Sequence, residues 1–500
     1  MSRGNDLTRR NFVKGLAVAG AATAAAGMLA GCKKNEMVSL MPEKWDEEVD
    51  VVVVGLGGAG AAAAIEAHDA GAEVLVLEKG VTAGGSTAMC GQCIYGAGTS
   101  VQKALGIEDS AEDMLKYYKA VCDGDQEILK LLCDESASGI EWLIGLGMKV
   151  PAEVAMPGIT VGGIEPDFAD VTPVVPRSHW SASDGALWPT LLKAVKDREI
   201  KYYLETPASQ LIENGTEIVG VVAEKEGKPW HIKARKGVVV SAGGFSRNRN
   251  MLYDWVSSVD LVAFTCLTDE GEGIQMAQSV GAGIAFPDAI DGVPSWKNPE
   301  VPNNFTISPQ YTLADNPSYI IVNLDGNRFV NETTYYGYSN PRILEQPEGI
   351  CFVITCGEAG KKNIVTQDIK SSDTIEGLAK ELGIDPAGLV GTIEKWNQYC
   401  QEGKDPDFAR PILLSPVDTP PYYGAATYPG FAATQGGIKI NTKSEVLDAL
   451  SHEPISRLYA AGCGAASYGR LYPGCGSMVN EIIVTGRIAG KNVAKEEAWS

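Results

Sequence analysis

Histidine is rare in this sequence, and the few that occur are too scattered to form a metal site. The chain has 500 residues, and its four histidines are His68, His179, His231 and His452. Metal sites draw their ligands from clustered histidines, cysteines and carboxylates. The pair Cys90 and Cys93 is not followed by a histidine, so it is not a haem attachment site, and no iron–sulfur spacing occurs. We therefore expect no metal, haem or iron–sulfur cluster.

Positively charged residues are also fewer than negatively charged ones. The chain carries 42 lysines and arginines against 63 aspartates and glutamates, a formal net charge of −21. Such a chain repels nucleic acid and anionic lipid headgroups, so we set nucleic-acid functions aside. Long apolar runs are missing as well: the stretch that starts at Gly15 has about 15 weakly hydrophobic residues, short of the ~20 that span a bilayer. Any attachment to a membrane needs another cause.

The N-terminus supplies that cause. Arg9 and Arg10 form a paired-arginine region, and an Ala/Gly-rich apolar stretch follows it and ends in Leu29-Ala30-Gly31-Cys32. This is the pattern of a twin-arginine export signal that ends in a lipobox. We predict that residues 1–32 are the signal, that Cys32 is lipidated, and that residues 33–48 form a linker. The lipid would hold the exported protein at the outer face of the cytoplasmic membrane or in the periplasm.

Glycine and apolar residues are abundant. With 57 glycines and 45% hydrophobic residues, the chain is typical of a globular α/β protein of two or three domains. The ten cysteines after Cys32 are expected to be mostly free, buried thiols, because a chain that folds before export has little need of disulfides. Cys90 and Cys93 can be interpreted as a redox pair or as packing residues, and packing is favoured.

A strand, a glycine turn and a helix begin the folded part. Val49–Val54 is a β-branched run typical of a buried parallel strand, and it leads into Gly55-Leu56-Gly57-Gly58-Ala59-Gly60. Gly55 permits the tight turn, Gly57 lets the backbone approach a pyrophosphate, and Gly60 lets the next helix pack closely. A second strand, Glu73–Leu77, is followed by Glu78, whose carboxylate can bind ribose hydroxyls. These residues predict a dinucleotide site.

Residues after the second strand favour FAD over a nicotinamide cofactor. Lys79-Gly80 and Thr82-Ala83-Gly84-Gly85-Ser86-Thr87 place small residues and hydroxyls where a flavin protein threads its cofactor under the sheet. Two further strands, in Gly237–Gly244 and Arg457–Gly462, lead into glycine turns. A helix opens at Gly476 and continues through Ile488.

Three more segments complete the pattern, namely Asn323–Glu332, Ala432–Asn441 and Gly486–Gly490. With them the chain resembles the flavoprotein subunits of fumarate reductase and succinate dehydrogenase and their 3-ketosteroid dehydrogenase relatives, over nearly all of residues 48–495. The resemblance implies a Rossmann-like α/β FAD domain built from both chain ends, with an inserted α+β capping domain. The implied limits are 49–284 and 421–500 for the FAD domain and 285–420 for the cap.

The motifs and the resemblance together assign the FAD contacts to turns, small side chains and the residues after the second strand. These positions are Gly55, Gly57, Gly58, Ala59, Gly60, Glu78, Lys79, Gly84, Gly85, Ser86, Thr87, Ala208, Ala242, Gly243, Gly462, Gly476, Ser477 and Met478. Relatives that carry FAD covalently have a histidine just after the Gly-Gly-Ser segment, where this chain has Ala88 and Met89, so non-covalent binding is expected. Cys463 replaces a frequent glutamate and weakens one contact.

The positions that hold a dicarboxylate in fumarate reductases carry other residues here. Counting from Asn331-Glu332, the proton-donating arginine of those enzymes falls on Tyr336. A second arginine falls on Pro473, and a histidine falls on Ala433. Two desolvated carboxylates need charge-assisted and preferably bidentate donors, so these replacements argue against a C4 dicarboxylate. The possible substitutes are Arg342 and Arg470.

The same positions are similar to the ketosteroid dehydrogenase branch. Arg470–Gly476 resembles its Tyr-Pro-Gly-x-Gly segment, which implies that the Tyr472 hydroxyl and the Gly476 N–H bind a ketone oxygen. Asn331–Tyr336 resembles its Asn-Glu-x-x-x-Tyr segment, so Tyr336 would handle a proton, with Tyr335 as the alternative if the register differs by one. A further tyrosine of that branch, from an N-terminal helix, has no match, because the alignment places Glu135 there.

These residues suit hydride and proton transfer at a C=C or CH–CH bond next to a carbonyl. Hydride transfer to the β-carbon puts negative charge on the carbonyl oxygen, which two preorganised donors would stabilise. The leading hypothesis is an FAD-dependent oxidoreductase for a 3-ketosteroid or similar apolar enone, exchanging electrons with a separate membrane-bound partner, cytochrome or quinone-linked. The alternatives are a reductase of a small unsaturated acid, such as fumarate, urocanate or acrylate, and a non-catalytic FAD lipoprotein that relays electrons.

Overall fold

The computed structural model describes residues 41–151, 175–256, 262–263, 265–297, 305–306, 318–332, 336–362, 364, 366–410 and 414–499. They belong to a unit that spans residues 41–500. The predicted signal, with Cys32, and Tyr335 lie outside the described residues, as does the side chain of Tyr336. Within these ranges, no helix combines the length and the apolarity needed to cross a membrane.

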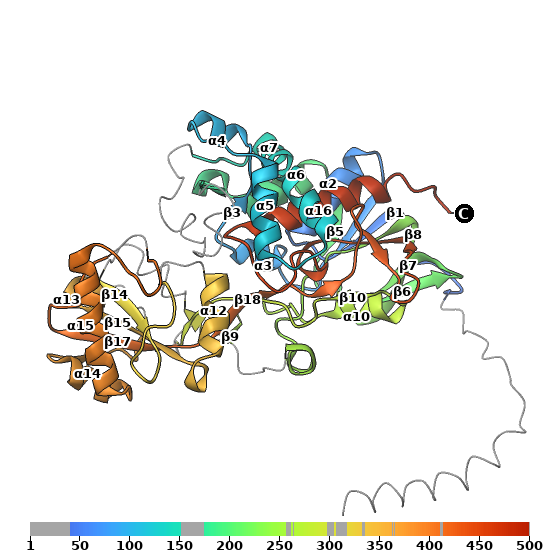
Figure 1. Cartoon of the computed structure of the whole chain (residues 1–500). Helices are drawn as coiled ribbons and strands as arrows, with labels where there is room; N and C mark the ends of the chain where they lie inside the picture. Colours follow the sequence, from blue (N-terminus) through green and yellow to red (C-terminus); the bar gives the residue numbers. More distant parts are fainter. Residues whose placement is uncertain are drawn as a thin grey trace, which may run out of the picture. The chain divides into compact units, whose positions relative to one another are not determined.

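An eight-stranded mixed sheet organises the larger part of the described chain. Its strands are β1 (Glu47–Val54), β2 (Val74–Leu77), β5 (Lys201–Tyr203), β6 (Ala208–Asn214), β7 (Glu217–Lys225), β8 (Lys228–Val240), β20 (Glu445–Leu447) and β21 (Pro454–Ala460). The order is β20-β21-β7-β8-β1-β2-β5, with β6 beside β7 and a further pairing of β21 with β8. Figure 1 labels β1, β8, β7 and β6, which are successive neighbours in this sheet. β1 starts at Glu47 rather than Val49, because Glu47 and Glu48 already pair with β8.

Both faces of β1 are buried, as its continuous valine run predicts for a parallel strand covered on both sides. Val51 and Val53 enter an apolar cluster with four helices, and Val52 and Val54 enter a second cluster on the other side. The first cluster includes residues of α2 (Gly58–Asp69), α7 (Ser136–Leu146), α8 (Leu187–Asp197) and α16 (Ser477–Val493). The second includes residues of α5 (Ala111–Val121), α6 (Gln126–Asp134) and α10 (Glu272–Ser279).

The two ends of the chain meet where α2 packs against α16. A Cβ added at Gly486 would lie 2.6 Å from the Ala59 carbonyl oxygen, and one at Gly490 would lie 2.2 Å from that of Ala63. The two helix backbones therefore approach more closely than any side chain permits, which accounts for the glycines of Gly486–Gly490. Because β1 and β21 also both pair with β8, the larger domain takes its core from both ends of the chain.

A four-stranded antiparallel sheet forms the centre of the capping region, in the order β14-β15-β17-β16. Its strands are β14 (Tyr319–Val322), β15 (Cys351–Cys356), β16 (Lys370–Ser372) and β17 (Tyr422–Thr427). Helices α14 (Ile375–Leu382) and α15 (Pro386–Glu402) share an apolar cluster with this sheet and lie beside it in Figure 1. The α+β character expected of the cap is thus present.

Shorter elements make up much of the rest of the described chain, and two pairs of them cross the expected domain limits. They are α3 (Gly85–Met89), β3 (Cys93–Tyr95), α4 (Ser100–Ala104), β4 (Ser178–Trp180), α9 (Arg249–Met251), β9 (Val262–Ala263), β10 (Ile284–Ala285), β11 (Ile290–Gly292), β12 (Trp296–Lys297), β13 (Phe305–Thr306), α12 (Tyr336–Leu344), α13 (Gly357–Lys361), β18 (Gly430–Thr434) and β19 (Gly437–Ile438). β10 pairs with β19 and β11 pairs with β18, while β17, which starts at Tyr422, belongs to the cap sheet. The limits at 285 and 420 stay predictions.

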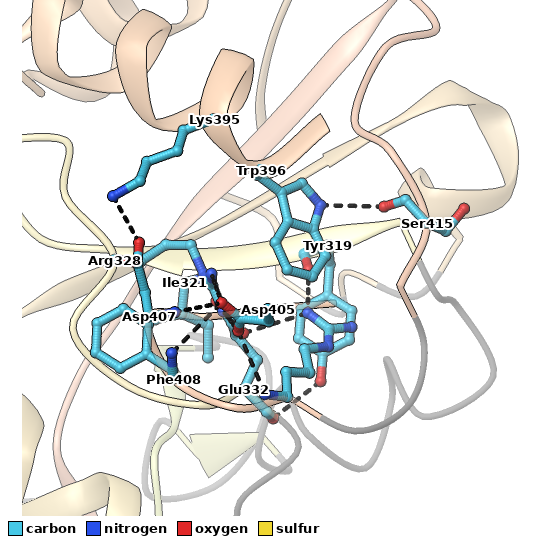
Figure 2. A network of polar contacts seen from close by, with 11 residues as sticks. Tyr319, Ile321, Arg328, Glu332, Lys395, Trp396, Asp405, Asp407, Phe408 and Ser415 are labelled. Carbon is cyan, nitrogen blue, oxygen red and sulfur yellow. Dashed lines mark hydrogen bonds and ion pairs between the residues drawn. The ribbon is translucent and has the colours of Figure 1, made fainter. Parts of the chain in front are cut away.

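A buried cluster of charged side chains ties the cap sheet to its loops (Figure 2). The Arg328 guanidinium donates to the Glu332 carboxylate at 2.7 and 2.8 Å and to Asp405 at 2.9 Å. Arg410 donates to Glu332 at 3.3 Å and to the Tyr319 carbonyl oxygen at 2.7 Å. Two arginines thus face two carboxylates, and the hydrogen bonds offset the cost of burying their charges. Arg328 and Glu332, the charged residues of the Asn-Arg-Phe-Val-Asn-Glu run, therefore help to stabilise the cap.

Candidate active site

A cavity of about 940 Å³ lies at the carboxyl ends of the central strands. Residues that follow β1, β2, β8 and β21 line it, including Gly55, Glu78, Ala242 and Gly462. This edge is where open α/β sheets bind ligands. The volume suits a large ligand, since small-molecule sites run from roughly 300 to 1,000 Å³.

The positions predicted to contact FAD gather at this cavity. All of them line it except Gly60, Gly84 and Ser477. Those three lie behind the wall and shape it. A Cβ at Gly60 would lie 1.9 Å from the Gly55 carbonyl oxygen, and Gly84 has a φ of +125° that favours glycine. The Ser477 hydroxyl accepts a hydrogen bond from Tyr118 at 3.2 Å.

The glycine turn after β1 is packed on one side and open on the other. A Cβ at Gly55 would lie 2.5 Å from the Ser241 carbonyl oxygen, so no other residue fits there. A Cβ at Gly57 would meet only the Gly84 carbonyl oxygen, at 3.8 Å. Gly57 therefore leaves room toward the cavity, as a turn that cradles a pyrophosphate at a helix N-terminus requires.

Glu78 presents a fixed carboxylate at the end of β2. One of its oxygens accepts the Leu56 N–H at 2.9 Å, and the other accepts the Gly80 N–H at 2.7 Å. A carboxylate has about four acceptor positions, so two remain for ribose hydroxyls. The neighbouring Lys79 is the basic side chain among the cavity-lining residues, and it forms ion pairs with Glu270, at 2.6 Å, and with Glu272.

The N-terminus of α16 faces the cavity. Gly476 precedes the helix with a φ of +91°, and a Cβ there would lie 2.8 Å from the Ile94 backbone, so both the conformation and the space require glycine. Gly476, Met478 and Val479 all line the cavity. A helix N-terminus carries partial positive charge, so this wall favours an oxygen that becomes negative.

Tyr472 lines the cavity from the loop before α16, and its side chain is nearly fully buried. The hydroxyl oxygen accepts the Met478 N–H at 3.1 Å. Burial raises the pKa of Tyr472, so the hydroxyl keeps its proton at neutral pH. A hydroxyl that accepts a hydrogen bond can also donate one, which is the role predicted for Tyr472.

Other buried tyrosines support Tyr472 from behind. Tyr468 packs edge-on against Tyr472 with ring centroids 6.4 Å apart, and Tyr118 of α5 packs edge-on against Tyr468 at 5.6 Å. The Tyr468 hydroxyl donates to the Ser477 carbonyl oxygen at 2.6 Å. These contacts fix Tyr472 relative to the start of α16. Glu135, which stands where the ketosteroid dehydrogenase branch has a further tyrosine, caps the C-terminus of α6, accepts a hydrogen bond from Ser138 and is not among the residues that line the cavity.

The three positions that lost dicarboxylate-binding residues are filled by groups without positive charge. Ala433 lines the cavity, and the Pro473 carbonyl oxygen accepts the Tyr117 hydroxyl at 2.6 Å. Tyr336 begins α12. Arg470, one of the possible substitutes, is half exposed and bound to two carboxylates, Asp123 at 2.7 Å and Asp288 at 2.9 Å.

Cysteines line part of the cavity, and the ten cysteines of the described residues are free thiols. Those at the cavity are Cys90, Cys93, Cys266, Cys463 and Cys475. Burial raises the pKa of both Cys90 and Cys93, and Cys475 raises that of Cys93 further. Because the thiolate is the reactive form, this environment favours packing over redox chemistry for the pair.

Asp291 is a cavity residue that the sequence did not reveal. It lies on β11, is 3% exposed, and lines the same cavity as Tyr472. An isolated acid between Ile290 and Gly292 carries no motif. Only the pairing of β11 with β18, which sets Asp291 opposite Ala433, brings it to the site.

Comparison with known proteins identifies the family. A family model described as the FAD binding domain matches residues 50–479. The chain belongs to this family. The flavoprotein is 29% identical to a digoxin reductase of Eggerthella lenta, over 98% of this chain and 97% of that protein. It is 31% identical to a probable fumarate reductase, Ifc3, of Shewanella frigidimarina, over 90% of this chain and 75% of that protein.

Among solved structures, the flavoprotein is similar to a 3-ketosteroid-Δ4-(5α)-dehydrogenase of Rhodococcus jostii RHA1 in complex with 4-androstene-3,17-dione. The TM-score is 0.77 at 29% identity, covering 91% of this chain and 98% of that one. These similarities confirm the fold class, the FAD cofactor and the fumarate reductase and ketosteroid dehydrogenase superfamily. The flavoprotein is an FAD-dependent oxidoreductase that acts on a C=C or CH–CH bond of a small molecule. This activity does not fit the alternative of a non-catalytic FAD protein that only relays electrons.

The residues at the cavity fit FAD. The space beside Gly57 would hold the pyrophosphate, and the Glu78 carboxylate would bind the ribose. The positive end of α16 would face the flavin end of the cofactor. None of these features requires a covalent bond to the flavin.

Replacing Gly57 with valine is expected to give a folded protein that has lost FAD. The backbone angles at Gly57, φ −89° and ψ −166°, suit any residue, and the new side chain would enter the cavity rather than strike the protein. We expect FAD affinity to fall at least about tenfold, measured as the ratio of flavin to protein absorbance and by titration with FAD. Gly145→Val, at an open position on α7, is the matched control and should retain FAD. Normal FAD content in Gly57→Val would mean that the pyrophosphate lies elsewhere.

Proposed function

We propose that this flavoprotein transfers a hydride and a proton across a C=C or CH–CH bond next to the carbonyl of a neutral, largely apolar substrate, with a 3-ketosteroid as the best candidate. The observation that carries the proposal is the pair Tyr472 and Gly476, set at the positive end of α16 in a cavity whose described lining contains no arginine. Digoxin reductase and ketosteroid dehydrogenase are among the similar proteins, which supports the same substrate class.

The residues would act on the substrate carbonyl. Bound FAD supplies or accepts the hydride. The Tyr472 O–H and the Gly476 N–H would donate hydrogen bonds to the carbonyl oxygen, which gains negative charge as the hydride reaches the β-carbon. Tyr336, at the start of α12, remains the predicted acid or base for the α-carbon proton, with Tyr335 as the alternative.

The charge of the cavity supports a neutral substrate. Its described lining includes the acids Glu78, Asp269, Glu272 and Asp291, and its one basic residue, Lys79, is already paired. A dicarboxylate would bring two more negative charges into this lining without a guanidinium to receive them. A ketone brings none.

A reductase of a small unsaturated acid is the second candidate, and the similarity to a fumarate reductase favours it. Its substrate carboxylate would need a cation. Arg470 is held by Asp123 and Asp288, so Arg342 of α12 would have to serve.

The electron partner and the location follow from the sequence rather than from the fold. We propose a separate cytochrome or quinone-linked partner at the membrane, because the sequence has no haem or iron–sulfur motif of its own.

We also propose that the protein is exported by the twin-arginine route and anchored through Cys32. Membrane fractions of cells that produce the parent should contain the protein, and those that produce Cys32→Ala should not. Equal fractionation of the two would refute the anchor.

Anaerobic reoxidation of the reduced flavin separates the two substrate classes. The purified protein, from residue 33 onward, is reduced and mixed with apolar enones, 3-ketosteroids and unsaturated acids, while flavin absorbance is followed. We expect reoxidation by an apolar enone to be at least about 100-fold faster than by fumarate, acrylate or urocanate. Rapid reoxidation by one of these acids, with all ketosteroids inert, would overturn the proposal.

A further inference from the structure

Asp291 brings a carboxyl group to the cavity wall that the proposed reaction has not yet used. Its backbone is fixed by the pairing of β11 with β18. Its side chain lines the cavity together with Tyr472 and Gly476. Oδ1 is buried and has no hydrogen-bond partner among the described residues. Buried polar atoms are nearly always hydrogen-bonded, so an unpartnered oxygen at a cavity wall points to a bonding partner that a ligand supplies.

Among the residues that the structure describes, no positive charge compensates Asp291. The titratable groups that face it are Tyr472 and Cys475, from the loop before α16, and Cys463, from the turn after β21. Asn340 of α12, which packs against Gly292, is uncharged, and Arg470 is held by its two surface carboxylates. Burial, and to a lesser extent Cys475, raises the pKa of Asp291 well above its ordinary range, so the carboxyl group keeps its proton to a higher pH than an exposed aspartate does.

A carboxylic acid that keeps its proton in an apolar site is a hydrogen-bond donor. The arrangement has a chemical precedent: in ketosteroid isomerase, a tyrosine and a protonated aspartic acid together form the oxyanion hole. Here the acid lies on a strand and the tyrosine on a loop, and both line one cavity.

We propose that Asp291 is a catalytic residue of this flavoprotein: in its protonated form it donates a hydrogen bond to the substrate carbonyl oxygen, beside the Tyr472 hydroxyl. The inference rests on the proposed function, because it requires a carbonyl substrate. The bond strengthens as negative charge develops on that oxygen, so it lowers the barrier rather than merely binding the ground state. The proton stays on Asp291, and the proton that reaches the α-carbon comes from another group.

This role fixes the direction of a pH dependence. Asp291 donates only while protonated, so kcat is full below its pKa and falls as the pH rises through it. Tyr472 would also lose its donor on deprotonation, but its pKa is raised above the ordinary value near 10. A variant that cannot ionise at position 291 separates the two groups.

The test compares Asp291→Asn with Asp291→Ala in the FAD-loaded enzyme, with an apolar enone that the parent reduces. The asparagine amide keeps an N–H donor and cannot ionise, so we expect kcat within about tenfold of the parent and loss of the alkaline fall. Alanine removes the donor, and kcat should drop about 100- to 1,000-fold. Asp288→Asn changes a half-exposed carboxylate in the same segment and should stay within about threefold of the parent.

A binding measurement on the parent covers the case in which a variant does not fold. The dissociation constant of a non-reacting ketone for the oxidised enzyme is followed by flavin absorbance. It should rise with pH over the same alkaline range in which kcat falls. If kcat of Asp291→Ala stayed within about threefold of the parent, this role alone would be wrong. The same would follow if neither the ketone affinity nor the kcat of the parent changed on the alkaline side of the pH profile. A parent that reduces no enone would overturn the proposed function, and the role of Asp291 with it.

Discussion

Replacing Tyr472 with phenylalanine is expected to lower kcat for an enone about 100- to 1,000-fold, the loss typical of removing one oxyanion donor. The substitution keeps the ring and its edge-on contact with Tyr468, and it deletes the hydroxyl at the cavity. Because that hydrogen bond strengthens in the transition state, kcat should carry more of the loss than KM. Single-turnover reoxidation of the reduced enzyme by the enone measures the effect directly.

Tyr459→Phe is the matched control for this change. Tyr459 is also buried, and its hydroxyl donates to Glu496 at 2.7 Å, but it does not line the cavity. It should leave kcat within about threefold of the parent. FAD content and melting temperature must be measured alongside, because Tyr472→Phe removes the acceptor of the Met478 N–H at the start of α16. If Tyr472→Phe turned over within about threefold of the parent, Tyr472 would not be an oxyanion donor.

The capping region should lose about 3–5 kcal/mol of stability when Glu332 is replaced by alanine. Glu332 binds Arg328 through two hydrogen bonds and Arg410 through a third, and all three side chains are at most 5% exposed. The variant would take from both buried guanidinium groups the carboxylate that they share, while Arg328 would keep its ion pair with Asp405 (Figure 2). Urea unfolding followed by tryptophan fluorescence measures the loss, because Trp396 stacks on Arg328 at 4.5 Å.

Lys395→Ala offers the comparison on the surface of the same region. Lys395 and Asp407 form an ion pair at 2.8 Å, but the lysine side chain is more than half exposed. Exposed pairs contribute about 0–1 kcal/mol, so this variant should unfold close to the parent midpoint. Equal losses in the two variants would show that the buried cluster contributes no more than a surface pair.

The cofactor side of the site was predictable because its signals are local. The valines of β1, the turn from Gly55 to Gly60 and Glu78 follow one another within a single strand-turn-helix-strand unit, and each residue type is dictated by its own backbone position. The same holds for Gly476, whose φ of +91° and contact with Ile94 leave no alternative. Such motifs can be recognised in a sequence because the local backbone geometry requires a particular residue type at each position.

The substrate side was predictable only in part. Tyr472 followed from similarity to a family segment, but its support by Tyr118 and Tyr468 depends on packing between α5 and the loop before α16. Asp291 reaches the cavity because its strand pairs with Ala433, far along the chain. No local sequence pattern predicts this pairing. Tyr336 begins α12, and its role in proton transfer stays a prediction.

The shared packing of the two chain ends decides when the protein can take up FAD during its synthesis. β21 and α16 come from the last residues of the chain, yet they pair with β8 and pack on α2. A ribosome adds roughly 5–20 residues per second, so the glycine turn after β1 waits tens of seconds for these partners. The strands of the capping region lie between residues 319 and 427 and need no such delay. We therefore expect the FAD site to be complete only once β21 and α16 have been synthesised, and until then the edge of β8 that pairs with β21 is open to aggregation.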